Sequence, residues 1–315
     1  MNDFSDKLQS IKNQENHYTK PFKSYDELLE LLQSRGLNIS NNAYALLKLQ
    51  HIGYYRLSAY FLPLQHKKDS NQKNMFLPDV TFEDILELYY FDTKLRRLIF
   101  EAIERIEIYF RTQIAHCHSA EYGAFGYLDK ENLKCSQEFF DQLQDAISKE
   151  KNRSRESFVN HFKKKYNSTD LPIWAVVEVI SMSTLSKLYA SLKTRQQQQI
   201  VKPFAKINKD VLYNWFHALT VVRNTCAHHT RLWNKTLGVK FEVPKKHEIF
   251  KKIGSSNDRV FFALSVIAFI LESIGEELEF KEQIKTLLKE YPSIDLKAMG
   301  FVDDWENLAI WSEYE

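Results

Sequence analysis

A long stretch without glycine or proline runs from Asp79 to Tyr122 and constrains the fold more than any other feature of the sequence. Apolar side chains recur within it at steps of three and four residues, the spacing of one buried helix face. Thr81 followed by Asp84 has the pattern of a helix start. We therefore predict one amphipathic helix of about 40 residues from residue 81 onward, on the order of 55 Å long.

The composition indicates that the rest of the chain is helical too. Gly and Pro total only 8 and 7 in 315 residues, too few for the tight turns of an all-β fold. An apolar content of 44% with 27% charged residues is typical of a globular protein with a sizeable core. The predicted fold class is all-α, a multi-helix bundle with an N-terminal helical subdomain.

Start and stop signals place the other elements. Ser24 and Glu27 have capping-box spacing and Gly36 is a stop, so a helix is predicted over residues 25–35. A second helix is expected from about Ser40 to Gly53. Further helices are expected at 137–150, 155–166, 172–193, 208–227, 258–274 and 276–290, with one short strand at 238–244.

These elements suggest three regions. Residues 1–80 form an N-terminal helical subdomain that ends in a polar loop at 66–79. Residues 81–292 form the helical core, and residues 293–315 form an acidic, aromatic tail.

The string Arg-x4-His occurs twice near predicted helix ends, as RTQIAH from Arg111 to His116 and as RNTCAH from Arg223 to His228. Imidazole transfers protons near neutral pH, and guanidinium binds a phosphate that gains charge, which together suit metal-free cleavage of RNA. Within one helix, however, Arg and His of one motif point about 140° apart. We expect two helix ends to face each other, within one chain or across a homodimer, with Ala115 and Ala227 keeping the approach open.

Neighbouring residues suggest supporting roles and a simpler alternative. Asn224 lies four residues before His228 and could orient its imidazole, while Glu107 lies four residues before Arg111. Alternatively, Arg111 only pairs with Glu107 and His116 only caps its helix. The second motif is denser in donors, since His229 and Arg231 follow it, and this density favours a phosphate site.

Taken together, these residues resemble the Abi-like abortive-infection family, the AbiD/AbiF group of bacterial phage-defence proteins. Each of the similar segments occurs in the family's order, and the similarity covers roughly residues 20–235. The segments are KPFKSYDELLELLQSRGL (20–37), LQHIGYYRLSAYFLPL (49–64), FDTKLRRLIFEAIERIEIYFRTQIAH (91–116), LPIWAVVEVISMSTLSKLYASL (171–192) and RNTCAHHTRLWN (223–234).

The resemblance implies membership of the HEPN superfamily, helical domains that act largely as metal-independent RNases through an Arg-x4-His motif. It implies a HEPN-type bundle and catalytic roles for Arg223, Asn224 and His228, and also for Arg111 and His116. It further implies an RNA substrate and, for some members, restraint by a small non-coding RNA. The similarity weakens after residue 235.

The functional hypothesis is a toxin that cleaves single-stranded RNA by attack of the 2′-hydroxyl on the adjacent phosphate. The alternative is a regulator that binds RNA without cutting it. Candidate RNA-binding residues are His229, Arg231 and the run Lys163, Lys164 and Lys165, although such runs are more often solvated faces. Similar weaker candidates are Lys245-Lys246, Lys251-Lys252, Arg96-Arg97 and the aromatic residues Tyr54, Tyr55, Tyr60 and Phe61, which are more often core.

No cofactor, metal or membrane is expected. His116, Cys117 and His118 with Cys135 match no standard zinc spacing. The longest apolar run, Val260 to Leu271, is too short to cross a bilayer, and the N-terminus lacks the apolar block of a signal peptide. Three cysteines without CxxC spacing fit a reducing cytoplasm.

Overall fold

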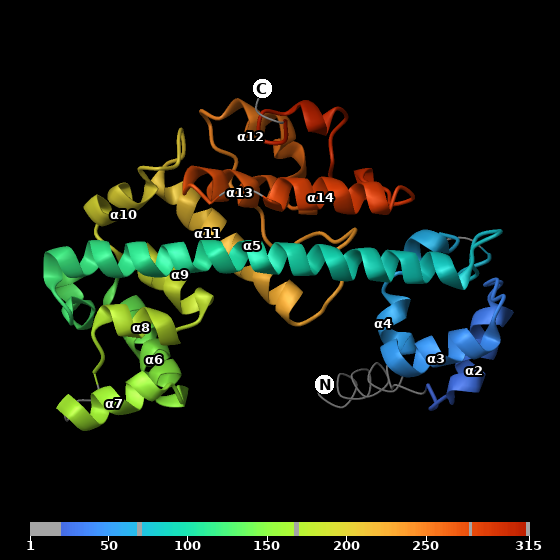
Figure 1. The fold of residues 1–315 in the computed structure, drawn as a ribbon, viewed down its shortest axis with the longest axis horizontal. Coiled ribbons are helices and arrows are strands. Elements are labelled where there is room, and N and C mark those ends of the chain that lie inside the picture. Colours follow the sequence, from blue (N-terminus) through green and yellow to red (C-terminus); the bar gives the residue numbers. More distant parts are fainter. Residues whose placement is uncertain (1–19, 68–70, 167–169, 277–278, 313–315) are drawn as a thin grey trace, which may run out of the picture. The chain divides into compact units, whose positions relative to one another are not determined.

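The computed structural model describes residues 20–67, 71–166, 170–276 and 279–312 (Figure 1). The chain divides into two compact units, one extending to Tyr89 and the other beginning at Tyr90, so the boundary falls inside one long helix. The described residues form helices and irregular segments, with two isolated bridge pairs and no strand. The prediction of an all-α, multi-helix protein is confirmed.

Figure 1 labels the α-helices, and six single-turn 3-10 helices lie between them in the described residues. The α-helices are α2 (Tyr25–Ser34), α3 (Asn42–Ile52), α4 (Tyr54–Ser58), α5 (Phe82–Tyr122), α6 (Gln137–Arg153), α7 (Ser157–Tyr166), α8 (Ile173–Val179), α9 (Met182–Ser191), α10 (Thr194–Val201), α11 (Lys209–Ala227), α12 (Glu248–Ile253), α13 (Val260–Ser273) and α14 (Glu279–Glu290). The 3-10 helices are Leu62–Leu64, Gly126–Leu128, Lys130–Asn132, Gly254–Ser256, Lys297–Met299 and Trp305–Asn307.

The predicted helix starts are confirmed in atomic detail. Ser24 and Glu27 form the capping box of α2, each side chain accepting a hydrogen bond from the backbone N–H of the other residue. Thr81 and Asp84 make the same reciprocal pair at the start of α5. That helix is 41 residues long, so the absence of glycine and proline did indicate one unbroken element.

The single helix predicted over residues 172–193 is wrong, because the chain breaks into α8 and α9 at Ile180. Ile180 has an extended backbone, and the Ser181 hydroxyl accepts the N–H of Thr184 to cap α9. The carboxylate of Glu150 accepts both the N–H of Ser181, at 2.7 Å, and its hydroxyl, at 2.9 Å. A side chain distant in the sequence therefore stabilises the break.

The strand predicted at 238–244 is also wrong, since these residues have an irregular conformation. Most of their backbone hydrogen bonds are to side chains, and the N–H of Phe241 bonds to the carbonyl of Asn257. Asn214 accepts the N–H of Glu242 and donates to the carbonyl of Lys240, and the Trp215 indole donates to the carbonyl of Glu242. The short helices α10 and α12 were not predicted, because neither carries a strong apolar period.

In the N-terminal unit, helices α2, α3 and α4 bury a small core that includes two of the candidate stacking residues. Tyr60 and Phe61 are almost fully buried, and Phe61 makes edge contacts with Tyr54 and Phe76. The expectation that these aromatic residues are core is confirmed for Tyr60 and Phe61. Tyr55, by contrast, is 91% exposed.

In the C-terminal unit, α5 from Tyr90 onward is covered by α11 and α9. Phe110 on α5 stacks on Phe216 of α11, with 4.3 Å between ring centroids, and packs edge-on against Tyr189 of α9. Aromatic pairs of this kind contribute about 1 kcal/mol each beyond their burial. These contacts fix α11 against α5, which is the arrangement that builds the site described below.

Helix α13 is buried on all sides from Val260 to Leu271, and α14 lies along α5 (Figure 1). Trp305 and Trp311 from the C-terminal segment pack on Phe261 of α13, and the Trp311 indole donates to Ser265 at 3.0 Å. None of the described helices is long and apolar enough to cross a membrane.

The buried His118 predicts an acid sensitivity of the fold. Burial lowers the pKa of His118, and nearby Gln196 and Gly126 offset only part of that effect. The unfolded chain therefore binds a proton near pH 6.5 that the folded chain resists, so stability falls as the pH drops below that value. We expect the difference in melting temperature between pH 7.5 and pH 5.5 to shrink in His118→Leu.

The matched control is His217→Leu, because His217 is exposed on α11. It should leave the pH dependence of the melting temperature as in the wild type. An unchanged pH dependence in His118→Leu would show that His118 is not the source of the acid sensitivity. If the variant is less stable overall, the test still works, because it compares the melting temperatures of the same variant at two pH values.

Candidate functional site

The second motif lies at the C-terminal end of α11, where the helix closes in a Schellman motif. His228 is the C-cap residue of α11, and the next residue, His229, has a left-handed backbone conformation with φ +55°. The N–H of His229 bonds to the carbonyl of Cys226, and the N–H of Thr230 bonds to that of Thr225. Glycine usually occupies the left-handed position, which is held here by His229, and both His228 and His229 are exposed.

One turn earlier on α11, Arg223 extends toward α5. Its guanidinium lies over the ring of Phe100, 5.4 Å from the centroid, and its Nε is 3.9 Å from Oε2 of Glu107. The other interaction is a long hydrogen bond to Oδ1 of Asn224, at 3.5 Å.

The first motif provides the second arginine of the same cluster. Arg111 lies one turn after Glu107 on α5 and forms an ion pair with its Oε1. Glu107 thus uses one carboxylate oxygen for Arg111 and the other for Arg223, and it is only 8% exposed. The structure therefore brings the two motif arginines together within one chain.

These side chains line a cavity of about 280 Å³. One nitrogen of Arg111, Nη1, is shielded from solvent and has no hydrogen-bond partner among the described residues. A buried guanidinium N–H without an acceptor is costly unless a ligand or water supplies one. The cavity is lined by Phe100, Glu104, Glu107, Ile108, Arg111 and Arg223.

A second cavity of about 410 Å³ lies next to the first, and Phe100 and Glu104 line both. It lies between α5 and the end of α11. Burial raises the pKa of the Cys226 thiol to about 12, so this thiol stays protonated and is a poor nucleophile. The lining consists of Thr93, Arg96, Arg97, Phe100, Glu101, Glu104, Cys226, Ala227 and His229.

The remaining motif residues lie around these cavities in different ways. His116 and His228 are exposed, and neither lines the two cavities. The oxygen of the Asn224 side chain accepts from Arg223, and no hydrogen bond to the His228 imidazole is formed. Ala227 borders the second cavity as expected, whereas Ala115 is only 6% exposed and lines neither of the two cavities.

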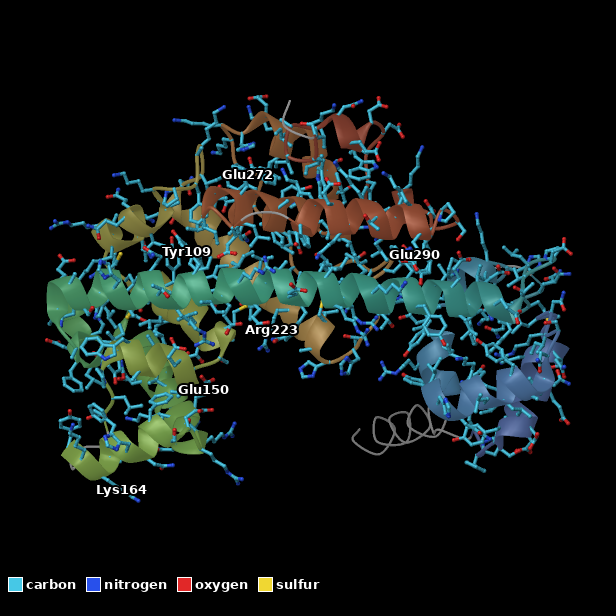
Figure 2. The ribbon with its side chains drawn as sticks, in the orientation of Figure 1. Tyr109, Glu150, Lys164, Arg223, Glu272 and Glu290 are labelled. Atoms are coloured by element: carbon cyan, nitrogen blue, oxygen red, sulfur yellow. The ribbon has the colours of Figure 1, made fainter. Side chains whose placement is uncertain are left out.

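Among the candidate RNA-binding residues outside the motifs, His229 and Arg97 line the second cavity, whereas the lysine run does not. Lys163, Lys164 and Lys165 are on α7, and Figure 2 shows Lys164 well separated from Arg223. Arg231 is half-buried just after the turn that carries His229. None of the described residues form a group of three or more His, Cys, Asp or Glu side chains placed to hold a metal ion.

Arg96 and Arg97 are neighbours in the sequence but lie in different environments. Arg96 is only 5% exposed and pairs with Asp92, so its proposed contact with an RNA backbone is wrong. Arg97 is exposed. The division follows from the helix period, which turns one residue into the core and the next toward solvent.

Asp92 is a functional candidate that the sequence analysis missed. Its fully buried carboxylate accepts the N–H groups of Leu232 and Trp233, at 3.1 and 2.6 Å, besides pairing with Arg96. The segment that follows the two histidines is thereby tied to α5. The spacing of Asp92 and Arg96, four residues apart on a helix, was the available signal.

Comparison with known families agrees with this arrangement. The family described as Abi-like protein matches residues 47–234, more than half of the chain and a span that includes both motifs. The chain belongs to the Abi-like family, and its membership points to abortive-infection phage defence. Comparisons with curated proteins and with solved structures give no match.

The anchoring role of Asp92 gives a stability prediction. Asp92→Ala leaves Arg96 buried without this carboxylate and two N–H groups without their acceptor, so we expect a loss of about 3–5 kcal/mol in the free energy of unfolding. Chemical denaturation measures it.

Asp145→Ala is the matched control, since Asp145 pairs with Lys149 at the same i,i+4 spacing but on an exposed face. That change should cost less than about 1 kcal/mol. Equal losses in the two variants would show that Asp92 does not anchor the segment.

Proposed function

We propose that the protein is a metal-independent endoribonuclease that cleaves single-stranded RNA during abortive infection. The observation that carries the proposal is the pairing of Arg111 and Arg223 on the two oxygens of Glu107. Two guanidiniums held side by side at a cavity can bind one phosphate from two directions. The family membership and the resemblance to HEPN ribonucleases support the same conclusion.

The arginines would act on the transition state. Attack of a 2′-hydroxyl on the adjacent phosphate produces a phosphorane that carries more negative charge than the ground state, and preorganised guanidiniums stabilise that charge. Arg111 and Arg223 both line the cavity, so their guanidiniums would supply the donors. Because Glu107 fixes both side chains, little reorganisation is needed when the charge develops.

The histidines would move the protons. One imidazole accepts the proton of the attacking 2′-hydroxyl, and a second donates a proton to the leaving 5′-oxygen. His228 and His116 are the candidates, with His229 as a further donor beside the cavity. The products carry 2′,3′-cyclic phosphate and 5′-hydroxyl ends, and DNA, which lacks the nucleophile, is not cut.

A cellular role follows from the same chemistry. An enzyme that cuts single-stranded RNA without a metal requires restraint in the cytoplasm until infection, and a small non-coding RNA is the proposed restraint. A homodimer is not required to bring the two arginines together, because both lie in one chain.

Cleavage in excess EDTA tests the proposal. The purified protein should cut a single-stranded RNA and leave DNA intact, and Arg223→Ala should lower the rate by about 100-fold or more. His228→Ala should lower it by a similar factor. Arg155→Ala and His217→Ala are the matched controls, because both residues are exposed and lie outside the cavities.

The outcomes separate the two candidate functions. Activity lost in EDTA, or products with 5′-phosphate ends, would exclude the metal-free reaction. RNA binding without cleavage by the wild type, together with binding unchanged in Arg223→Ala, would favour the non-catalytic regulator.

Glu107 gives a separate prediction about positioning. Glu107→Gln keeps the size of the side chain but removes the charge that orients both arginines. We expect kcat to fall by about 10–100-fold, since small displacements of catalytic groups have effects of this size. Glu83→Gln, an exposed change on the same helix that lies outside both cavities, is the control. A glutamine variant that retained full kcat would show that the carboxylate only balances charge.

A further inference from the structure

Arg97 is the one exposed arginine of α5, and it has no carboxylate partner among the described residues. Its i+4 neighbour, Glu101, pairs instead with Arg105 at 2.9 Å, and Arg97 makes no ion pair with any described residue. Exposed arginines on helices commonly find such partners. Arg97 therefore keeps a full set of unused guanidinium donors at the surface.

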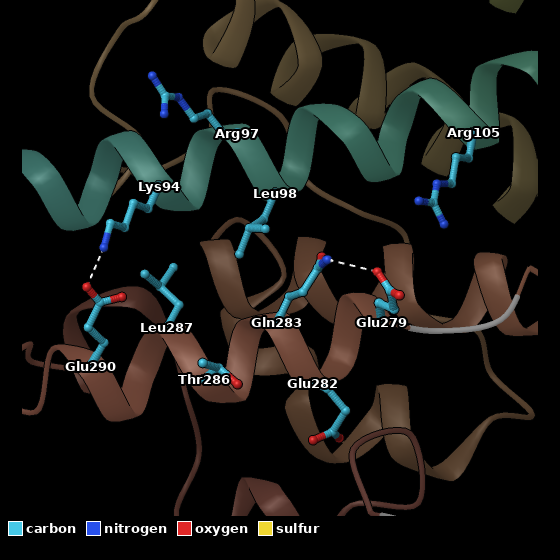
Figure 3. Close-up of a pocket in the computed structure, with 10 residues that line it drawn as sticks. All are labelled: Lys94, Arg97, Leu98, Arg105, Glu279, Glu282, Gln283, Thr286, Leu287 and Glu290. Carbon is cyan, nitrogen blue, oxygen red and sulfur yellow. Dashed lines mark hydrogen bonds and ion pairs between the residues drawn. The ribbon is translucent and has the colours of Figure 1, made fainter.

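Arg97 also lines two cavities. It lines the 410 Å³ cavity beside His229, and it lines a larger groove of about 860 Å³ between α5 and α14. In Figure 3 its guanidinium extends away from α14, whereas Lys94 reaches across to Glu290. The acids of α14 thus neutralise Lys94 and leave Arg97 available.

The charges along the two neighbouring cavities favour an anion. Two pairs cancel internally, Arg96 with Asp92 and Arg105 with Glu101. The arginines that remain are Arg97, Arg111 and Arg223, and the acids that remain are Glu104 and Glu107. Three positive side chains therefore face two negative ones.

We propose that Arg97 binds a phosphate of the RNA strand away from the linkage that is cut. The inference rests on the proposed ribonuclease function and adds a subsite to it. Arg97 lies about four helical turns before Arg111, about 20 Å along α5, so the phosphate that it binds is several nucleotides from the scissile one. Phe100 lines both cavities between them, with the Arg223 guanidinium over its ring.

Glu104 is the acidic residue that lines both cavities, and its charge is expected to weaken RNA binding. Glu104 is exposed, lines both cavities and has no hydrogen bond or ion pair with a described residue. It opposes a phosphate that passes between Arg97 and the Arg111–Arg223 pair. Its neutralisation should strengthen RNA binding, which is the opposite of the effect expected at Arg97.

Substrate length tests the subsite. The substrates are 2′-O-methyl oligonucleotides of two to ten nucleotides that contain one ribonucleotide, so that each has one possible cleavage point, and they are extended on either side. For the wild type, kcat/KM should rise with extension on one side. Arg97→Ala should lose about tenfold on the longest substrate and far less on the shortest one, and its affinity should depend less steeply on salt.

Arg155→Ala, a change of the same kind at a distant exposed position, should follow the wild type at every length. Arg97→Lys should restore part of the loss, and Glu104→Gln should lower Kd for the longest substrate about threefold. Equal cleavage of all lengths by Arg97→Ala and the wild type would overturn the subsite but leave the ribonuclease proposal intact. Absence of cleavage by the wild type at any length would overturn both.

Discussion

The candidate site depends on one carboxylate shared by two guanidiniums. Arginines repel each other, and an acid between them compensates the repulsion. Glu107 does so from a largely buried position, where its charge is less screened than it would be in bulk water. The two motifs, more than a hundred residues apart in the sequence, therefore meet at a single side chain.

Two kinds of packing place Glu107 where it acts. The aromatic stack of Phe110 on Phe216 fixes α11 against α5, one turn beyond Glu107 on the long helix. Asp92 then holds the backbone that leaves α11, through the N–H groups of Leu232 and Trp233. The turn with its two histidines is thus held at both ends, which limits how far the imidazoles can move relative to the arginines.

Features that depend on residues within one helical turn were predicted correctly from the sequence. Features that depend on contacts between residues far apart in the sequence were not. The long helix, its Thr81 start and the Ser24 capping box depend on residues within one turn, and all three were predicted. The break at Ile180 depends on Glu150, and the irregular path near Lys240 depends on Asn214. At the site, the pair of Glu107 with Arg111 followed from helical spacing. The contact of Glu107 with Arg223 required the packing of two helices.

The left-handed His229 has a consequence for how this helix terminus evolves. Glycine would close the turn without strain, whereas histidine holds a conformation that costs L-residues roughly 1–2 kcal/mol. Substitution by glycine is thus the easy route to a more stable fold, and it removes an imidazole from the edge of the cavity. If the reaction depends on the imidazole of His229, selection keeps histidine although glycine would make the fold more stable. Stability and catalytic turnover therefore favour different residues at this position.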